Sequence, residues 1–163
     1  MGNIDQARNV LLATLMLCGC SDKPAYQSKT VTELERMLDS PNAAERVQGA
    51  FGLSRRAAEA KPAVPALIKS LQSSDVLLRM QSALALGAIG PDARAAAPHL
   101  SAALNDPEWS VRRQAAVSLG QIGPDAHAAA PALRRMERDD PHTLVRKAAQ
   151  KALPLVKPSG ATK

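Results

Sequence analysis

Apolar positions recur along most of this chain every three or four residues, which is the spacing of amphipathic helices. In DPEWSVRRQAAVSLGQIG, residues 106 to 123, the apolar positions recur at intervals of four, four and three: Val111, Ala115, Leu119 and Ile122. That spacing places them on one face of an α-helix. We expect Asp106 to cap this helix, Pro107 to fill its first position, and Gly123 to end it.

A second helix is predicted after the first. Pro124 prevents the first helix from continuing, so a turn must follow Gly123. Pro131 fits the first turn of a new helix, and Leu133 and Met136 continue an apolar stripe beyond it. The segment therefore predicts a pair of antiparallel helices.

The helix pair recurs at a fixed period. ALGAIGPDARAAAPHL begins at residue 85, and the similar SLGQIGPDAHAAAPAL begins 33 residues later, at 118. A proline precedes each second helix at the same interval of 33 residues: Pro65, Pro98 and Pro131. A period of this size indicates stacked units that are stable only together. We predict one all-α domain over residues 31–156, a right-handed α-solenoid of stacked antiparallel helix pairs.

The two ends of the array depart from the repeat. The first unit has Arg56 where later units have isoleucine, so its first helix is expected to run longer and to end in a more polar segment. TVTELERMLDS, residues 30 to 40, is predicted to be a lone second helix that caps the array through Leu34, Met37 and Leu38. Residues 145–153 form a final half-unit, and residues 157–163 are predicted to be disordered.

The composition suits closely packed helices and permits an anionic partner. Only Tyr26, Phe51 and Trp109 are aromatic, so small aliphatic side chains must fill the interior. The chain has 21 Lys and Arg against 15 Asp and Glu, a formal net charge of +6. This charge attracts anions without specifying one.

The first twenty residues, MGNIDQARNVLLATLMLCGC, have the order of a secretory signal. Their last four resemble the bacterial lipoprotein box, with leucine three positions before a cysteine and glycine directly before it. The resemblance implies a signal peptide at residues 1–19, a lipid anchor on Cys20 and a polar tether at 20–30. It also implies a location on the periplasmic side of the cell envelope, at the outer membrane if the cell has two.

An alternative interpretation of this segment remains open. Residues 4–17 can instead form an amphipathic helix packed on the end of the domain, with Cys18 and Cys20 as buried thiols in a cytoplasmic protein. The apolar run from Val10 to Leu17 is too short to span a membrane, which takes about 20 residues.

The repeat itself resembles a known family. The phrase D-P-x-x-x-V-R-x-x-A-A-x-x-L-G-x-I-G-P, followed by A-x-x-A-x-P-x-L, is similar to the HEAT-like repeats of bacteria, including those of phycobilisome lyases. The resemblance covers roughly residues 31–156 and implies an interaction scaffold. It also implies that the second helices line the concave surface of the solenoid.

Positions that recur in every unit are expected to serve the stack. An arginine recurs near the start of each first helix: Arg46, Arg79, Arg112 and Arg146. We predict a structural ladder in which these side chains bond to loop carbonyls or to Asp75, Asp106 and Asp140 in neighbouring turns. The alternative is a basic binding stripe.

Positions that vary between units are the candidate partner contacts. On the second helices these positions are basic toward the C-terminus and include Lys69, His99, Arg134, Arg135 and Arg138. The alternative is a solvated face without a partner. Trp109 stands in a turn between units, where Ala43, Leu77 and Thr143 stand elsewhere. An exposed aromatic residue is typical of a binding hot spot, but Trp109 can equally pack over the edge of the next unit.

The sequence offers no catalytic machinery, cofactor site or metal site. The three histidines lack ligand spacing, and no phosphate loop or nucleophile motif is present. We therefore expect a non-catalytic scaffold, lipid-anchored at the envelope, that binds a protein or peptide. One alternative is a cytosolic binder of nucleic acid or another polyanion, as in HEAT-like DNA glycosylases, although few aromatic residues are available for stacking. Another is a subunit related to the bilin lyases, which resemble longer solenoids.

Overall fold

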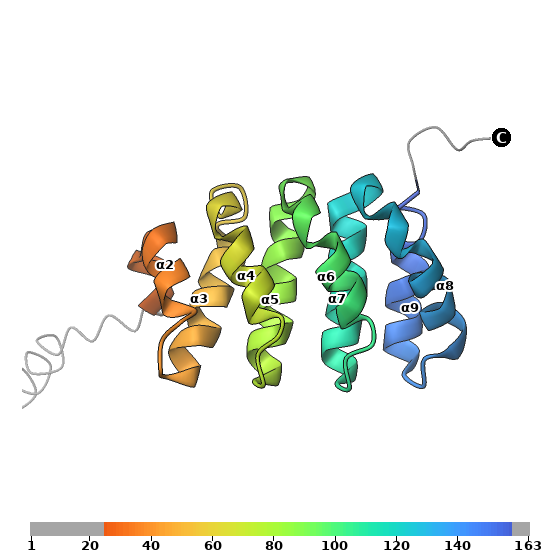
Figure 1. Cartoon of the computed structure of the whole chain (residues 1–163), viewed down its shortest axis with the longest axis horizontal. Helices are drawn as coiled ribbons and strands as arrows, with labels where there is room; N and C mark the ends of the chain where they lie inside the picture. The colour runs from red at the N-terminus through yellow and green to blue at the C-terminus, as the bar shows by residue number, and fades with distance from the viewer. Residues whose placement is uncertain (1–24, 158–163) are drawn as a thin grey trace, which may run out of the picture.

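A computed structural model describes residues 25–157, which form a row of stacked helix pairs (Figure 1). The first helices of the units are α3 (Ala43–Arg55), α5 (Val76–Ile89), α7 (Trp109–Ile122) and α9 (Thr143–Ala152). The second helices are α2 (Val31–Met37), α4 (Val64–Ser70), α6 (Ala97–Ala103) and α8 (Ala130–Asp139). Short 3-10 helices join several of them: η1 (Ala25–Ser28), η2 (Lys61–Ala63), η3 (Gly90–Ala96) and η4 (Gly123–Ala129).

The units stack through their first helices. Helix α5 packs between α3 and α7, and α7 in turn contacts α9. Each second helix packs against the first helix that follows it, as α4 does on α5 and α8 on α9. This arrangement confirms the predicted all-α solenoid.

The glycine and proline pair after α5 and α7 ends each helix as expected. Gly90 has φ +71° and Gly123 has φ +82°, a region that L-residues with a side chain rarely adopt. The chain then forms η3 or η4 where the sequence predicted a turn, and α6 and α8 begin one residue before Pro98 and Pro131.

Two local expectations are wrong. Helix α7 begins at Trp109 rather than Pro107, because the Asp106 carboxylate accepts from the N–H of Glu108 at 2.9 Å and holds the preceding residues in a turn. Helix α3 has 13 residues against 14 in α5, so it does not run longer. At Arg56 the backbone leaves the helical region, with φ −106° and ψ 19°, so α3 ends at Arg55. The Arg56 side chain pairs with Glu59.

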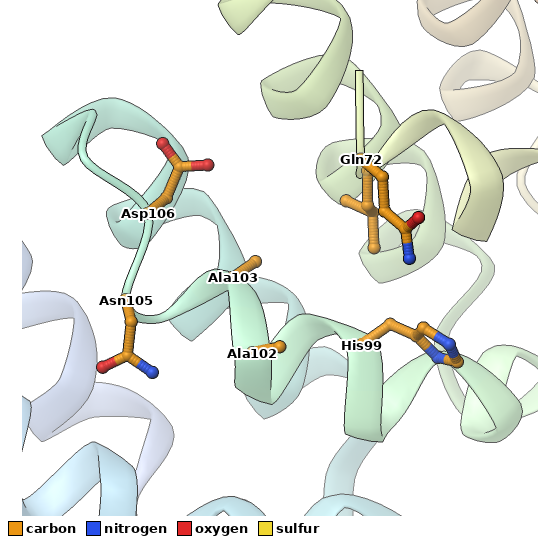
Figure 2. Close-up of a pocket in the computed structure, with 7 residues that line it drawn as sticks. Gln72, His99, Ala102, Ala103, Asn105 and Asp106 are labelled. Carbon is orange, nitrogen blue, oxygen red and sulfur yellow. The ribbon is translucent and has the colours of Figure 1, made fainter. Parts of the chain in front are cut away.

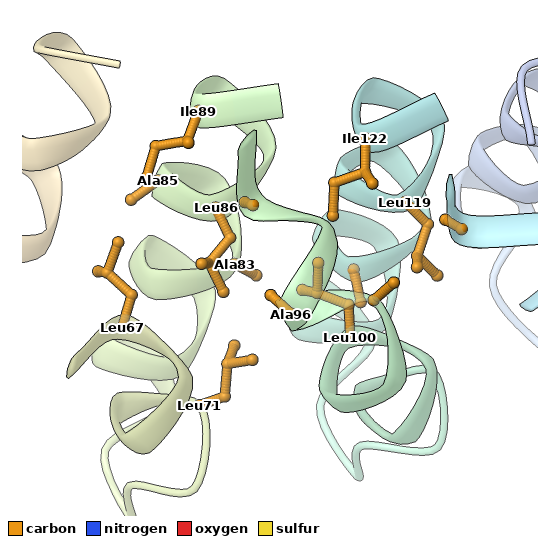
Figure 3. Packing of buried hydrophobic residues seen from close by; sticks show 14 of the residues in the cluster. Leu67, Leu71, Ala83, Ala85, Leu86, Ile89, Ala96, Leu100, Leu119 and Ile122 are labelled. Carbon is orange, nitrogen blue, oxygen red and sulfur yellow. The ribbon is translucent and has the colours of Figure 1, made fainter. Parts of the chain in front are cut away.

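Leucines from each unit fill the core between first and second helices (Figure 3). Leu53, Leu86 and Leu119 are fully buried, and burial of such a side chain stabilises the fold by about 1.5 to 3 kcal/mol. Small residues let the first helices approach: Ser118 on α7 donates through Oγ to the carbonyl of Ala83 on α5 at 2.6 Å. The stack is therefore held by leucines on one side of each first helix and by small residues on another.

The N-terminal end is closed by α2 and η1. Thr30 and Glu33 form a capping box at the start of α2, and Leu34 and Leu38 are buried against α3 while Met37 is half-buried. The ring of Tyr26 in η1 meets the ring of Phe51 on α3 edge to face, with centroids 5.1 Å apart. Across residues 25–157, the helices are too short or too polar to cross a lipid bilayer.

Candidate protein-binding surface

Three cavities lie in a row between successive second helices. The first, of about 430 Å³, lies between α2 and α4 and includes Asp39 and Lys69 in its lining. The second, of about 240 Å³, lies between α4 and α6, and the third, of about 370 Å³, between α6 and α8. The cavities occupy equivalent places in successive units along one side of the solenoid, and the three together are hereafter called the inter-unit groove.

Side chains from adjacent units face each other across the groove (Figure 2). In its middle cavity, Gln72 at the end of α4 lies opposite His99 and Ala102 on α6. In the next cavity Arg135 on α8 lines the wall together with Asp139 and Asp140. The groove thus offers hydrogen-bonding groups and charges of both signs.

A second row of cavities lies beside the groove. One, of about 400 Å³, is lined by Arg94, Ser101 and Asp125 among others. Another, of about 370 Å³, lies at the C-terminal end and is lined by Arg134, Arg138 and Lys157. The three arginines of α8 therefore do not meet in one cavity: Arg135 lines the inter-unit groove, while Arg134 and Arg138 line the neighbouring row.

Two lysines of the early units are paired with acids. Lys69 Nζ lies 2.7 Å from Asp39 Oδ1, and Lys61 Nζ lies 3.0 Å from Asp92 Oδ1. In the described part of the chain, no ion pair within 4.0 Å involves Arg134 or Arg135. Arg134 and Arg135 are exposed and therefore available to an anionic group at the α8 end of this surface. The cavities there also carry acids, because Glu137 lines one and Asp139 and Asp140 line the other.

Trp109 lies at the turn edge of the solenoid and not in the groove. Its ring stacks on that of His142 in the next unit, with centroids 5.4 Å apart and an interplanar angle of 25°, and the residue is 38% exposed. Trp109 begins α7 as Val76 begins α5. Its counterpart is thus Val76, and the assignment of Leu77 to that position is wrong.

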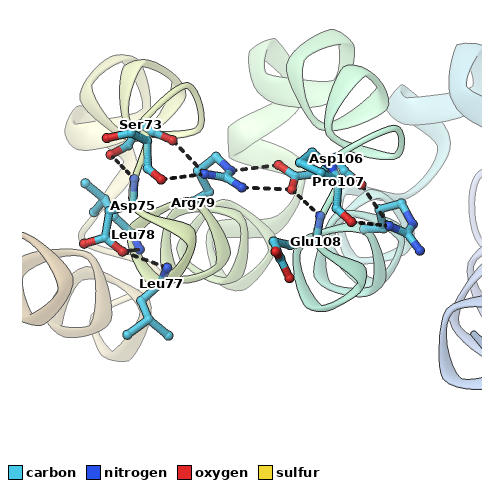
Figure 4. A network of polar contacts seen from close by, with 10 residues as sticks. Ser73, Asp75, Leu77, Leu78, Arg79, Asp106, Pro107 and Glu108 are labelled. Atoms are coloured by element: carbon cyan, nitrogen blue, oxygen red, sulfur yellow. Dashed lines mark hydrogen bonds and ion pairs between the residues drawn. The ribbon is translucent and has the colours of Figure 1, made fainter.

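Two of the recurring arginines form inter-unit ion pairs, and Figure 4 shows the pair of Arg79 with Asp106. Arg79 donates through Nε to Asp106 Oδ2 at 2.7 Å and through Nη2 to Asp106 Oδ1 at 2.9 Å, while Nη1 donates to the carbonyl of Ser73 at 2.9 Å. Arg112 makes the same bidentate contact with Asp140, from Nε to Oδ2 at 2.7 Å and from Nη2 to Oδ1 at 3.2 Å. Each pair ties the start of one first helix to the turn before the next.

These contacts change the ionisation of the paired carboxyl groups. Burial alone would raise the pKa of Asp106, but hydrogen bonds from Arg79 and from the N–H of Glu108 outweigh burial and lower that pKa. The pKa of Asp140 is lowered for the same reasons, by Arg112 and the N–H of His142. The hydrogen bond to Asp106 raises the pKa of Arg79. Both pairs are therefore ionised at neutral pH.

The outer arginines bind carbonyl and hydroxyl oxygens. Arg46 donates to the carbonyls of Ser40 and Pro41, and it has no carboxylate opposite because Ser73 stands where Asp106 stands one unit later. Arg146 donates to the carbonyls of Asp140 and Pro141 and to the hydroxyl of Thr143. Asp75 caps α5 by accepting from the N–H of Leu77, so it is not an arginine partner.

Some expectations fall outside the described residues or receive no test from them. The signal peptide, the lipidation site at Cys20 and most of the tether precede residue 25, and the predicted disordered tail lies almost wholly after residue 157. Within the described range, three or more His, Cys, Asp or Glu side chains do not come together in a way that could hold a metal ion.

Comparison of the second helices missed an apolar stripe on the first helices. Leu77, Met80 and Leu84 lie along α5 on the side away from the core, with Leu77 57% exposed. The sequence of α5, VLLRMQSALALGAI, carried this signal, because it is apolar on nearly every side while its surroundings bury only part of it.

Known proteins with the same architecture include a lyase, a hydroxylase and an engineered protein. A phycocyanin lyase complex of CpcE and CpcF from Nostoc sp. PCC7120 matches 78% of this chain and 53% of its own, with 28% identity and a TM-score of 0.70. Human deoxyhypusine hydroxylase in complex with glycerol matches 80% and 44%, with 29% identity and a TM-score of 0.59. An engineered protein at 24% identity, covering 77% and 62%, with a TM-score of 0.64, shares the fold alone.

This chain spans 44% to 62% of the length of those structures, and no relative with a curated description matches it. The model of HEAT repeats matches residues 31–108 and 91–154. Together with the stacked helix pairs, this match shows that the chain belongs to the HEAT-repeat proteins.

Proposed function

We propose that this protein is a non-catalytic scaffold that binds a protein or peptide along its inter-unit groove. The observation that carries the proposal is the row of three cavities in register, with walls that differ from unit to unit. A partner laid across the second helices would meet Lys69, His99 and Arg135 in turn. Similarity to a lyase that forms a complex of two proteins supports a protein partner.

The partner is expected to place acidic groups against α8. Arg134 and Arg135 are exposed, whereas Lys61 and Lys69 of the earlier units already have carboxylate partners. A charge-assisted hydrogen bond to guanidinium gives both geometric specificity and binding energy. The C-terminal unit would thus select the partner, and the earlier cavities would extend the contact.

Crosslinking in the native cell tests this proposal. An epitope-tagged chain is crosslinked, purified and compared with Arg134→Glu/Arg135→Glu and with Arg113→Glu, a charge reversal on a first helix. We expect one protein to be recovered with the parent and with Arg113→Glu and to be lost with the double variant. Titration of that purified protein should then show binding weakened at least about tenfold, because two charge-assisted contacts become repulsive.

Two other outcomes would contradict the groove proposal. Equal recovery with all three chains would show that α8 makes no contact with the partner. Recovery of nucleic acid, with binding that falls steeply as salt is raised, would favour the polyanion binder.

We also propose a lipid anchor on Cys20, on the strength of the sequence resemblance to the lipoprotein box. Mass spectrometry of the mature N-terminus tests it, with Cys20→Ala as control. A terminal peptide beginning at lipidated Cys20 and absent from the variant is expected. An unmodified Met1 or Gly2 terminus would remove the anchor and make a cytosolic scaffold the better account.

A subunit related to phycocyanin lyase is a second candidate function, favoured by the structural likeness to the complex of CpcE and CpcF. The chain spans 53% of the matched lyase chain, and that lyase is a complex of two proteins, so a partner subunit is expected for this function. A reconstituted pigment-transfer assay with and without this chain decides it. Transfer that depends on the chain would support the lyase role, and its absence would leave the scaffold alone.

A further inference from the structure

The first helices present a surface on the side opposite the inter-unit groove. Each unit contributes four positions to this surface. The first of the four is residue 44 in α3, 77 in α5, 110 in α7 and 144 in α9, and the other three follow at intervals of three, four and four residues. At 100° per residue these positions lie opposite the leucines that pack on the second helices. All sixteen residues are half-buried or exposed. We call this surface the outward face.

The outward face combines apolar and basic residues and lacks acids. Its charged members are Arg55, Arg113, Lys147 and Lys151, and none of its sixteen positions holds Asp or Glu. Its apolar members include Leu77, 57% exposed, and Leu144 and Leu155, 54% and 55% exposed. These are three of the four large hydrophobic residues that are exposed among residues 25–157, and the fourth, Trp109, stands at the margin.

The middle of the outward face is an unpartnered apolar stripe on α5. Met80 and Leu84 are half-buried but do not pack against the core, and Leu77 extends the same stripe. At the equivalent positions α7 has half-buried Ser110, exposed Arg113, and Val117, which packs against the core. Exposed apolar residues gathered on one face mark an interaction site.

The shape and charge of the outward face fit a flat anionic surface. None of the five cavities described above is lined by an outward residue. The apolar and basic residues are instead spread over successive first helices. A second copy of this chain fits poorly, because two such faces would bring eight basic residues together with no acid between them.

The outward face also lies beside the point where the N-terminal tether leaves the solenoid. Tyr26 packs against Phe51, an outward residue of α3. Cys20 precedes Tyr26 by six residues, which span at most about 20 Å when fully extended. A lipid on Cys20 would therefore hold this face close to the bilayer.

We propose that the outward face docks on an anionic phospholipid bilayer. Arg113, Lys147 and Lys151 meet the lipid phosphates, while Leu77, Leu144 and Leu155 enter the boundary between headgroups and acyl chains. Such binding sums apolar burial with attraction to anionic lipid. It leaves the inter-unit groove facing away from the membrane, open to a partner. That the outward face lies close to the bilayer rests in part on the proposed anchor at Cys20.

Vesicle flotation tests the proposal with the full chain carrying Cys18→Ala and Cys20→Ala, so that no lipid is attached. The vesicles are phosphatidylcholine alone or with one quarter phosphatidylglycerol. We expect binding to the anionic vesicles. Each basic residue near such a surface strengthens binding about fivefold, so Lys147→Glu/Lys151→Glu should weaken it at least about thirtyfold. Any contribution from residues 1–24 is common to all variants.

Arg134→Glu/Arg135→Glu is the matched control, since it makes the same change in charge on the neighbouring helix α8, on the groove side. It should leave vesicle binding nearly unchanged. Equal losses in both double variants, or no binding to anionic vesicles by the parent, would overturn the proposal. Because Cys20 is absent throughout, the result is independent of whether the native protein is lipidated.

A fluorescent probe decides which side meets the membrane. In the same background, Leu77→Cys places an environment-sensitive dye on the outward face and Gln72→Cys places it in the groove. Vesicles should shift the emission to the blue at position 77 only. A shift at position 72 only would overturn the proposal. A shift at position 77 that grows with protein concentration without lipid would do so too, by showing that a second copy covers the face.

Discussion

The seam, meaning the contacts of α5 with α7 and of α7 with α9, differs from the outward faces of these helices in how far the units agree. Across the seam the units agree: Arg79 and Arg112 make the same ion pair one unit apart, and Gly87 and Gly120 both lie against the next helix. On the outward face they differ, with Met80 on α5 replaced by Arg113 on α7.

The difference separates what stacking requires from what it leaves open. A residue in the seam packs against the next first helix. Because this contact recurs from unit to unit, each unit needs a side chain of the same size and charge at that position. An exposed residue on the outward face or in the groove, such as Leu77 or Arg135, faces mainly solvent, so stacking constrains it less. In this array, recurrence therefore marks structure and variation marks the candidate binding surfaces.

The largest expected effect comes from removing a carboxylate of the seam. Asp106→Ala leaves Arg79 nearly buried, with its side chain 11% exposed and no carboxylate partner, and should lower the free energy of unfolding by about 3 kcal/mol. Asp39→Ala breaks an inter-unit pair whose side chains are 70% and 75% exposed and should cost under about 1 kcal/mol. Urea unfolding measures both. Equal losses would show that burial does not distinguish the two pairs.

A side chain at Gly87 should separate α5 from α7. A Cβ there would lie 2.8 Å from Ser118 Cβ and also crowd the side-chain amide of Gln121. Gly87→Ala is therefore expected to lower the free energy of unfolding by about 1 to 3 kcal/mol. Ala88→Ser, the next residue but on the outward face, should cost only about 0.5 kcal/mol. Matching losses for the two variants would contradict the assigned contact.

Acid should weaken the seam through both ion pairs. The folded pKa values of Asp106 and Asp140 are lowered, so their stabilisation is present above the unfolded pKa of about 3.9 and is lost as pH falls through the folded values. Melting temperatures at pH 6 and pH 3 should therefore differ less for Asp106→Asn/Asp140→Asn than for the parent. The same decrease in both proteins would place the acid sensitivity elsewhere.

Changes on the two variable surfaces should have the smallest effect on stability. Arg134→Glu/Arg135→Glu in the groove region and Leu77→Ser on the outward face replace exposed side chains and should each change the free energy of unfolding by less than about 0.5 kcal/mol. Circular dichroism during urea unfolding checks this. A large loss from either variant would mean that the surface serves the stack after all.

Sequence periodicity predicted the stack because each unit repeats the same local physics. Gly90 and Gly123 end helices, Pro98 and Pro131 begin them, and the recurring leucines define the core. Long-range choices were less predictable. The recurring arginines were expected to bind loop carbonyls or Asp75, Asp106 and Asp140, but no local pattern assigned a partner to each. Asp106 binds Arg79 and does not cap α7, whereas Asp75 caps α5 and Arg46 has carbonyl partners.

The candidate surfaces were only partly visible in the sequence for a related reason. Comparison between units singled out the basic residues of α8. Neighbouring positions on a helix point in different directions, however, so Arg135 lines one row of cavities while Arg134 and Arg138 line another. The outward stripe of α5 was overlooked because an apolar helix in a solenoid is expected to be core. Only the burial of α5 shows that Leu77 is exposed and that Met80 and Leu84 are half-buried outside the core cluster.

Photo-crosslinking in the native cell tests most directly whether the groove binds a protein while the outward face binds the membrane. A photoreactive amino acid replaces Arg135 in the groove in one strain and Arg113 on the outward face in another. The account predicts a protein adduct from position 135 and a lipid adduct without that protein from position 113. The same protein adduct from both positions would contradict it, since one partner would then cover both faces.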